Sequence, residues 1–153
     1  MSCLRQNILM NLREELNIHA EKTWVLCIPE DSGENTKYLS PLTDLVDWYN
    51  NQILTKMILS KKITLKMGEQ TLISTIGLLP AEKLLVMGLG EKKLLSSSQA
   101  LKFIQVLSHT LESLNETNVW IIFSSQVPGK FLDEIKKSHA SSDSLAHTTI
   151  SVG

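Results

Sequence analysis

The sequence contains little cysteine and almost no net charge. Cys3 and Cys27 are the two cysteines among 153 residues, and they do not form a CxxC pair. This count excludes a disulfide scaffold and favours reduced thiols in the cytoplasm, with Cys27 as a small buried hydrophobe. The 15 Lys and Arg residues balance 16 Asp and Glu residues. A chain with this balance has no long-range field to attract nucleic acid.

Long apolar runs are also missing. Polar residues interrupt the first sixteen positions before a signal-peptide core can form, and no run reaches the roughly 20 apolar residues that span a bilayer. Secretion and membrane insertion are therefore disfavoured. The densest basic run is diluted by apolar residues, so we expect a solvated edge there rather than a phosphate site; its members are Lys56, Lys61, Lys62 and Lys66.

Length and composition favour one folded domain. The chain is 42% hydrophobic and 20% charged, and 153 residues suffice for a single core spanning residues 1–153. The last stretch is polar, so residues 138–153 form either a tail or, over 147–152, a final strand. The first segment is equally open, because its apolar residues fit both helical and strand spacing.

The first half of the chain alternates strand and helix signals. The apolar run Thr23–Ile28 predicts a buried strand that stops at Pro29. A three-to-four-residue apolar spacing predicts one helix over 41–58, with Ser40 as its N-cap. Residues 62–67 and 70–76 are expected to form two strands of a hairpin joined at Gly68-Glu69.

The second half contains a strand, helix, strand unit. The run 84–87 predicts a strand that is broken at Gly88-Leu89-Gly90. Ser96 and Gln99 have the spacing of a capping box and predict the start of a long amphipathic helix. The run 119–123 predicts the next strand, parallel to the first. A short helix is expected over 130–137.

These segments resemble the amino-terminal domain of the leucyl (cytosol) aminopeptidase family. The resemblance depends on Gly68-Glu-Gln-Thr-Leu-Ile-Ser, on Ala81-Glu-Lys-Leu-Leu-Val-Met-Gly-Leu-Gly-Glu-Lys, and on Val119-Trp-Ile-Ile-Phe. Trp24–Ile28 with its Pro-Glu-Asp exit is similar to the family's second strand. The resemblance implies a three-layer α/β/α, macro-domain-like fold with a mixed, mainly parallel sheet. It also implies that residues 6–14 form the first strand.

The catalytic half of that family is absent from this sequence. Family members hold two divalent metals in a second domain that carries Asn-Thr-Asp-Ala-Glu-Gly-Arg-Leu and Lys-Gly-hydrophobic-Thr-Phe-Asp motifs, and neither string occurs here. We therefore expect either a free-standing relative of the amino-terminal domain or a fragment of a full metal-dependent aminopeptidase. The resemblance implies self-association or an aminopeptidase catalytic domain as partner.

Catalytic arrangements are not evident in the remaining residues. The histidines His19, His109, His139 and His147 are scattered, so we expect no metal site and no cofactor. Ser96–Ser98 has no nucleophile-elbow context and fits helix capping. We therefore assign no catalytic residue and favour a non-catalytic accessory or interaction domain.

One segment remains as a candidate ligand site. Gly88, Leu89, Gly90 and Glu91 follow a predicted strand and precede a helix, where ligands gather in α/β sheets. Lys93 stands where the third glycine of G-x-G-x-x-G would be, so a tight, closely packed turn explains the glycines equally well. The alternative function is binding of a nucleotide or ADP-ribose. An apolar exposed helix face within Leu42–Leu54 would instead indicate a protein partner.

Overall fold

The computed structural model describes residues 14, 16–30, 40–75, 77–141 and 148–153. Within these ranges, five strands form one mixed sheet in the order β2-β3-β1-β4-β5. Four strands are parallel, namely β1 (Thr23–Glu30), β3 (Lys83–Glu91), β4 (Val119–Phe123) and β5 (Thr149–Val152). The strand β2 (Gln70–Ser74) is antiparallel at one edge. The expected α/β class with a mainly parallel sheet is confirmed.

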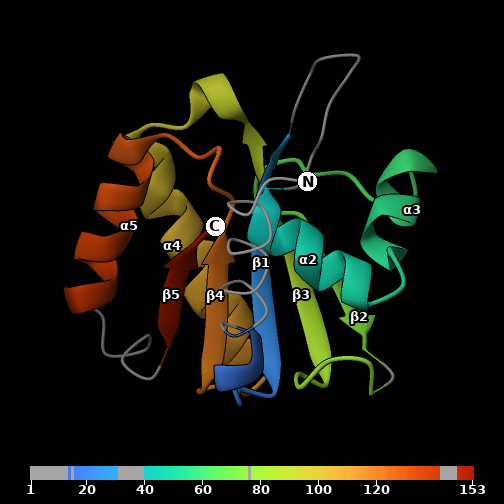
Figure 1. Cartoon of the computed structure of the whole chain (residues 1–153). Coiled ribbons are helices and arrows are strands. Elements are labelled where there is room, and N and C mark those ends of the chain that lie inside the picture. The colour runs from blue at the N-terminus through green and yellow to red at the C-terminus, as the bar shows by residue number, and fades with distance from the viewer. Residues whose placement is uncertain (1–13, 15, 31–39, 76, 142–147) are drawn as a thin grey trace, which may run out of the picture.

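Helices cover both faces of this sheet (Figure 1). The helices α4 (Ser97–Ser113) and α5 (Gly129–Ser141) pack on one face, and α2 (Pro41–Tyr49) and α3 (Ile53–Leu59) pack on the other. A short 3-10 helix, η1 (Lys92–Leu94), connects β3 to α4. The result is the three-layer α/β/α arrangement that the family resemblance implied.

The central strand β1 shows how the sequence produces two cores. Its side chains alternate between the faces, so Val25 and Cys27 lie in the core under α4 and α5. Trp24, Leu26 and Ile28 lie in the other core, under α2 and α3. Burial on both faces explains the continuous apolar run, which is typical of parallel sheets covered on both sides.

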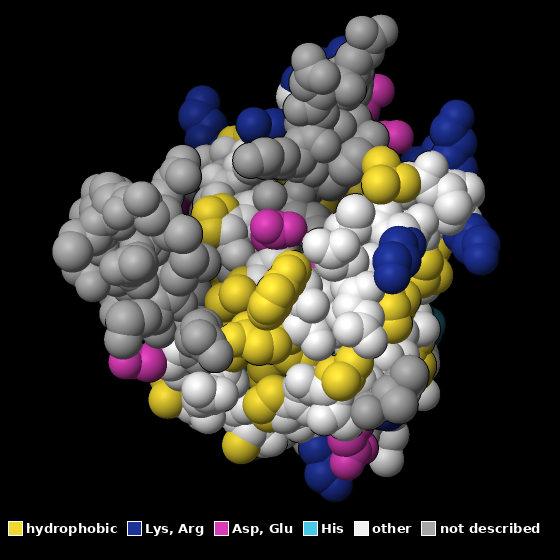
Figure 2. Space-filling model, turned by 45° about the vertical axis from the view of Figure 1, so that its right-hand side comes forward, with side chains coloured by type: hydrophobic (Ala, Val, Ile, Leu, Met, Phe, Trp, Pro, Cys, Tyr) yellow, Lys and Arg dark blue, Asp and Glu magenta, His cyan; other side chains and the backbone are white. Residues whose placement is uncertain are grey.

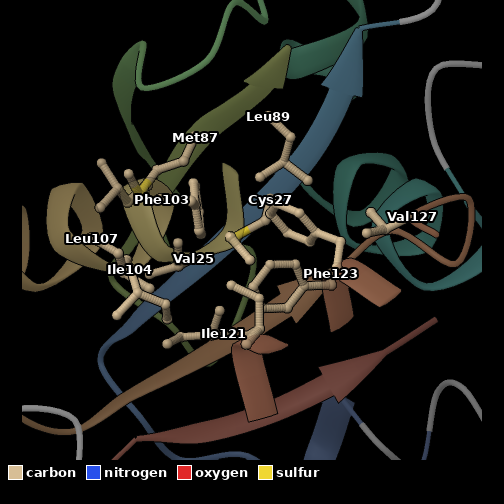
Figure 3. Close-up of a cluster of buried hydrophobic side chains, with 14 of the residues drawn as sticks. Val25, Cys27, Met87, Leu89, Phe103, Ile104, Leu107, Ile121, Phe123 and Val127 are labelled. Atoms are coloured by element: carbon tan, nitrogen blue, oxygen red, sulfur yellow. The ribbon is translucent and has the colours of Figure 1, made fainter. Parts of the chain in front are cut away.

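The core under α4 and α5 is closed by aromatic side chains (Figure 3). Phe103 of α4 lies with its ring centroid 5.9 Å from that of Phe123 and 6.2 Å from that of Phe131. All three side chains are fully buried. The helix begins where the capping box predicted, since the Ser96 hydroxyl accepts a hydrogen bond from the Gln99 backbone N–H at 3.4 Å.

The single helix predicted over 41–58 is wrong, because α2 and α3 are separate helices. Asn51 and Gln52 have positive φ angles of 60° and 56°, which interrupt the helical backbone. The Asp47 carboxylate stabilises the break by accepting hydrogen bonds from the backbone N–H groups of Leu54, at 2.8 Å, and Thr55, at 3.2 Å. Ser40 precedes α2, but its hydroxyl contacts Thr43 Oγ1 rather than a backbone N–H.

The predicted hairpin of 62–67 with 70–76 is also wrong. Residues 70–74 do form a strand, but its antiparallel partner is β3. Residues 62–67 are not a strand. The last of them lie beside the carboxyl end of β3, where the Gly90 N–H donates to the Leu65 carbonyl at 2.9 Å. A nonlocal pairing with β3 therefore replaces the local pairing that the glycine suggested.

Both central strands continue past the residues that were expected to end them. β1 runs through Pro29 to Glu30, and β3 runs through Gly88 and Gly90 to Glu91. Pro29 is tolerated where the register between β1 and β3 becomes irregular, between Ile28 and Glu30. The predictions of these strands, and of β4 and α5, are otherwise confirmed.

The two ends of the chain were left open by the sequence. Residues 1–13 lie outside the described part, so the strand expected over 6–14 does too, apart from Glu14, which is helical. At the other end, α5 reaches Ser141 and residues 149–152 form β5. Of the two alternatives for 147–152, the structure therefore has a strand over 149–152.

Candidate functional site

The predicted ligand segment Gly88–Glu91 lies at the carboxyl end of β3. The parallel strands β1, next to β3, and β4, next to β1, end on the same side of the sheet, and α4 begins there after η1 (Figure 1). Gly88, Leu89 and Gly90 are buried, and the Leu89 side chain belongs to the core under α4 and α5. Of these four residues, Glu91 alone is partly exposed. Direct contact with a ligand would therefore begin at Glu91.

Close packing accounts for both glycines. A Cβ atom on Gly88 would lie 2.3 Å from the Lys66 carbonyl oxygen, because the backbone of 65–66 passes directly over it. Gly90 has a φ of +75°, and a Cβ atom there would lie 3.3 Å from the Met67 backbone nitrogen. The two glycines thus permit the backbone of residues 65–68 to pack directly against β3 and to form hydrogen bonds with it. This structural requirement explains the motif without a ligand.

The charges at this end of the sheet are mixed. Glu30 of β1 is in register with Glu91 of β3, which places two acidic residues on adjacent strands. The Lys93 ammonium lies 3.5 Å from the Glu91 carboxylate, and Lys92 is exposed beside it. An anionic ligand would meet these lysines and the amino end of α4, but it would also meet the two carboxylates.

A second candidate site is the outer surface of α2 and α3. We call it the α2–α3 face and define it by five apolar residues, which are Leu45, Trp48, Tyr49, Ile53 and Met57. Trp48 is 61% exposed, although its ring system is large and mostly apolar. Its ring lies edge-on to that of Tyr49, with centroids 5.4 Å apart. The other members are half-buried against the core.

Hydrophobic side chains gather in the middle of this side of the molecule (Figure 2). The apolar helical spacing pointed to six residues, of which three are buried and three are half-buried; the buried ones are Leu42, Val46 and Leu54, and the half-buried ones are Leu45, Tyr49 and Ile53. Trp48 lies two positions after Val46 and therefore on the opposite side of the helix. The sequence analysis did not identify Trp48 as a candidate residue. The signal that could have identified it is a large apolar residue outside the three-to-four-residue apolar spacing.

The histidines do not form a site in the described part of the chain. His19 stacks on Trp120 with ring centroids 3.5 Å apart, and its Nδ1 lies 3.2 Å from a Glu21 carboxylate oxygen. His109 is exposed on α4, and His139 is hydrogen-bonded to Thr148 at 2.8 Å rather than solvated. His147 lies outside the described residues.

Neither a metal-ligand cluster nor the groups with shifted pKa values mark a site in the described part of the chain. Among the residues that the structure describes, no three His, Cys, Asp or Glu side chains converge as metal ligands, and no helix is long and apolar enough to cross a membrane. Burial raises the pKa of the Cys27 thiol. The hydrogen-bonded Lys83 ammonium, 2.8 Å away, lowers the pKa of Glu116, and the carboxylate in turn raises the pKa of Lys83. This pair lies at the other end of β3 from Glu91.

Solved structures share this fold. A mutant of tomato leucine aminopeptidase superposes with a TM-score of 0.61 at 13% identity, over 90% of this chain and 31% of that one. The macrodomain of DarG from Mycobacterium tuberculosis superposes with a TM-score of 0.55 at 10% identity, over 90% of this chain and 91% of that one. The macro domain of ganglioside induced differentiation associated protein 2 gives a TM-score of 0.53 at 12% identity, over 88% and 71% of the two chains.

The sequence itself assigns the family. No curated protein sequence matches the chain. The model of the N-terminal domain of the cytosol aminopeptidase family does match, over residues 32–140. That range contains the Gly88–Glu91 segment and the elements α2, α3, β2, β3, η1, α4 and β4, together with α5 except for Ser141. The chain therefore belongs to the cytosol aminopeptidase family, as its N-terminal domain.

Proposed function

We propose that this chain is a non-catalytic accessory domain that binds an aminopeptidase catalytic domain through the α2–α3 face. The observation that carries the proposal is Trp48, which is 61% exposed on a helix whose other large apolar residues are buried or half-buried. Large aromatic side chains are common anchors of protein interfaces and are costly to leave in water. The chain spans 31% of the tomato enzyme, so a catalytic domain is the partner that the family membership suggests.

The composition of the face supports a protein partner over a charged ligand. Its five defining residues are uncharged, and Asp44 and Lys56 are exposed charged residues on the same two helices. An apolar centre with a charged rim is the usual anatomy of a specific interface. Burial of Trp48 and its neighbours on binding would remove their apolar surface from water.

Isothermal titration against a catalytic domain of the family, prepared without its own N-terminal domain, tests this proposal. We expect Trp48→Ala to weaken binding at least about tenfold, as loss of an interface anchor does. Leu101→Ala is the matched control, because Leu101 is 48% exposed on α4, on the other side of the sheet. Equal affinities for the wild type and Trp48→Ala would contradict the proposal.

The non-catalytic part of the proposal has its own test. The purified 153-residue chain should release no leucine from a leucyl anilide in the presence of Mn²⁺ or Zn²⁺. Peptidase activity that survives repurification of the chain would show that it is catalytic.

Binding of ADP-ribose or a related nucleotide at Gly88–Glu91 is a second candidate function. It is favoured by the shared fold with macrodomains and by the place of the segment beside the amino end of α4. Calorimetry with ADP-ribose decides it, with Glu91→Gln as the variant, because Glu91 is the member of the segment that reaches the surface. Absence of heat at millimolar ligand would remove this candidate.

A further inference from the structure

Three lysines at the end of α3 form a positively charged border beside the α2–α3 face. Lys56, Lys61 and Lys62 are exposed, and we call them the α3 lysines. No Asp or Glu occurs from residue 48 to residue 68 of the sequence. Within the part of the chain that the structure describes, none of the three lysines belongs to an ion pair. Their positive charge is therefore not compensated by a contacting carboxylate of the described residues.

Hydrogen bonds place these lysines at the carboxyl ends of the two helices. Lys56 Nζ donates to the Asn51 carbonyl at 3.1 Å, at the break between α2 and α3. Lys61 has a φ of 58°, and the Lys62 N–H donates back to the Met57 carbonyl at 3.0 Å, which terminates the helical backbone after α3. An ammonium has three N–H donors, so Lys56 keeps two of them for an acceptor outside the chain.

Exposed apolar side chains adjoin the α3 lysines. Leu59, the last residue of α3, is 69% exposed and lies two positions before Lys61. Trp48 is 61% exposed, and its carbonyl accepts a hydrogen bond at 3.2 Å from the N–H of Asn51, the residue whose carbonyl binds Lys56. Figure 2 shows Lys or Arg side chains along the right-hand side of the hydrophobic centre. This surface therefore combines exposed apolar side chains with positive charge.

We infer that the catalytic-domain surface that covers the α2–α3 face is acidic and places carboxylates against the α3 lysines; this rests on the proposed function. Charge complementarity selects this chemistry, because opposite charges meet across specific interfaces and like charges are costly there. Asp44, in the first turn of α2, is the acidic residue toward the other end of the face. The carboxylates of the partner therefore lie toward α3, which fixes the orientation in which the partner binds.

Association kinetics of the 153-residue chain with a catalytic domain of the family, prepared without its own N-terminal domain, test the inference. The charge-reversed variant carries Lys56→Glu, Lys61→Glu and Lys62→Glu. Its association rate constant should fall at least about tenfold at low ionic strength, because charges at the border of an interface steer the encounter. A salt concentration of about 0.5 M should remove most of that difference, because it shortens the range of the electrostatic attraction to a few Å.

The matched control reverses three exposed lysines of α5, on the other face of the sheet, and changes the net charge equally; its substitutions are Lys130→Glu, Lys136→Glu and Lys137→Glu. This control should associate at close to the wild-type rate. A charge-reversed α3 variant that has the circular dichroism of the wild type and associates equally fast overturns the inference. A wild-type association rate that does not change with salt overturns it as well, without the use of a variant.

The outcomes separate this inference from the proposal on which it rests. If Trp48→Ala weakens binding while the charge-reversed α3 variant associates like the wild type, the acidic surface alone is overturned. Absence of binding by the wild-type chain overturns both. Cosedimentation with vesicles of phosphatidylserine and phosphatidylcholine tests a lipid surface, and the chain should stay in solution. Vesicle binding that the charge-reversed α3 variant loses would assign the lysines to lipid and overturn the inference.

Discussion

The two faces of the sheet differ in how completely they are closed. Under α4 and α5, three phenylalanines meet within a sealed core, and the 17-residue helix above them is continuous. On the other face, two short helices meet at a break with two positive φ angles, and Trp48 lies outside them in water. The comparison indicates that the first face mainly stabilises the fold, whereas the second leaves a large aromatic side chain exposed, which is the basis of the proposed interface.

The largest contrast should come from removing one aromatic ring on each face. Phe103→Ala deletes a fully buried ring and should lower the free energy of unfolding by about 3–5 kcal/mol. Trp48→Ala removes a larger but exposed ring and should change it by no more than about 0.5 kcal/mol. Urea unfolding followed by circular dichroism measures both. Comparable losses for the two variants would abolish the distinction between the faces.

The glycines at the carboxyl end of β3 give the next contrast. Gly88→Ala forces the backbone of 65–66 to move and should destabilise the protein by about 1–3 kcal/mol. Gly129→Ala is its control, because a Cβ atom there meets nothing within 4 Å. Thermal unfolding compares them. A neutral Gly88→Ala would mean that close packing does not explain the motif.

The break between α2 and α3 should depend on Asp47. Asp47→Ala leaves the first N–H groups of α3 without their acceptor and should cost about 1–2 kcal/mol. Asp133→Ala, at an exposed position of α5, should be close to neutral. Urea unfolding gives the cost, and backbone NMR shifts over 53–59 report the local change. Unaltered shifts would contradict the capping role.

The smallest effect is expected from the ion pair of Lys83 with Glu116. Because the carboxylate pKa is lowered and the ammonium pKa raised, the pair stabilises the fold between the ordinary values of 4.5 and 10.5. Its contribution disappears as pH falls through the lowered pKa of Glu116 or rises through the raised pKa of Lys83. Lys83 is 39% exposed, so solvent screening keeps the contribution below about 1 kcal/mol.

Unfolding of Lys83→Met and the wild type at pH 7 and pH 3 measures this contribution. The difference between the two proteins should be largest at pH 7 and become smaller as the pH falls below 4.5 toward pH 3, because Glu116 becomes protonated. Lys102→Met, an exposed lysine of α4, should show no such pH dependence. A difference that is equally large at pH 7 and pH 3 would assign the effect to packing of the lysine stem.

Local sequence signals predicted the α4 and α5 side better than the α2 and α3 side. Ser96, Gln99 and the apolar spacing of α4 act within one helix, so the sequence pattern was sufficient. The break at Asn51-Gln52 depends on Asp47 reaching the N–H groups of Leu54 and Thr55, seven and eight positions away. The periodic spacing of apolar residues carries no information about a side-chain contact with backbone N–H groups across a break.

The candidate sites show the same limit. The assignment of Gly88-Leu89-Gly90 to a candidate ligand site stays a prediction. Its glycines are explained by the Lys66 backbone, which reaches the segment through a nonlocal pairing. The apolar content of α2 was evident from the sequence, and the exposure of Trp48 required the packing of Leu42 and Val46 against the sheet. The pairing of β2 with β3 could not be identified while residues 70–76 were expected to pair with residues 62–67.

The exposure of Trp48 provides the most direct test of the accessory-domain account. Trp24 and Trp120 are fully buried, so Trp48 should supply the fluorescence that acrylamide quenches in the free chain. Addition of an aminopeptidase catalytic domain that contains no tryptophan should protect that fraction from quenching, because the α2–α3 face becomes covered. Binding that leaves Trp48 as accessible to acrylamide as in the free chain would contradict the account.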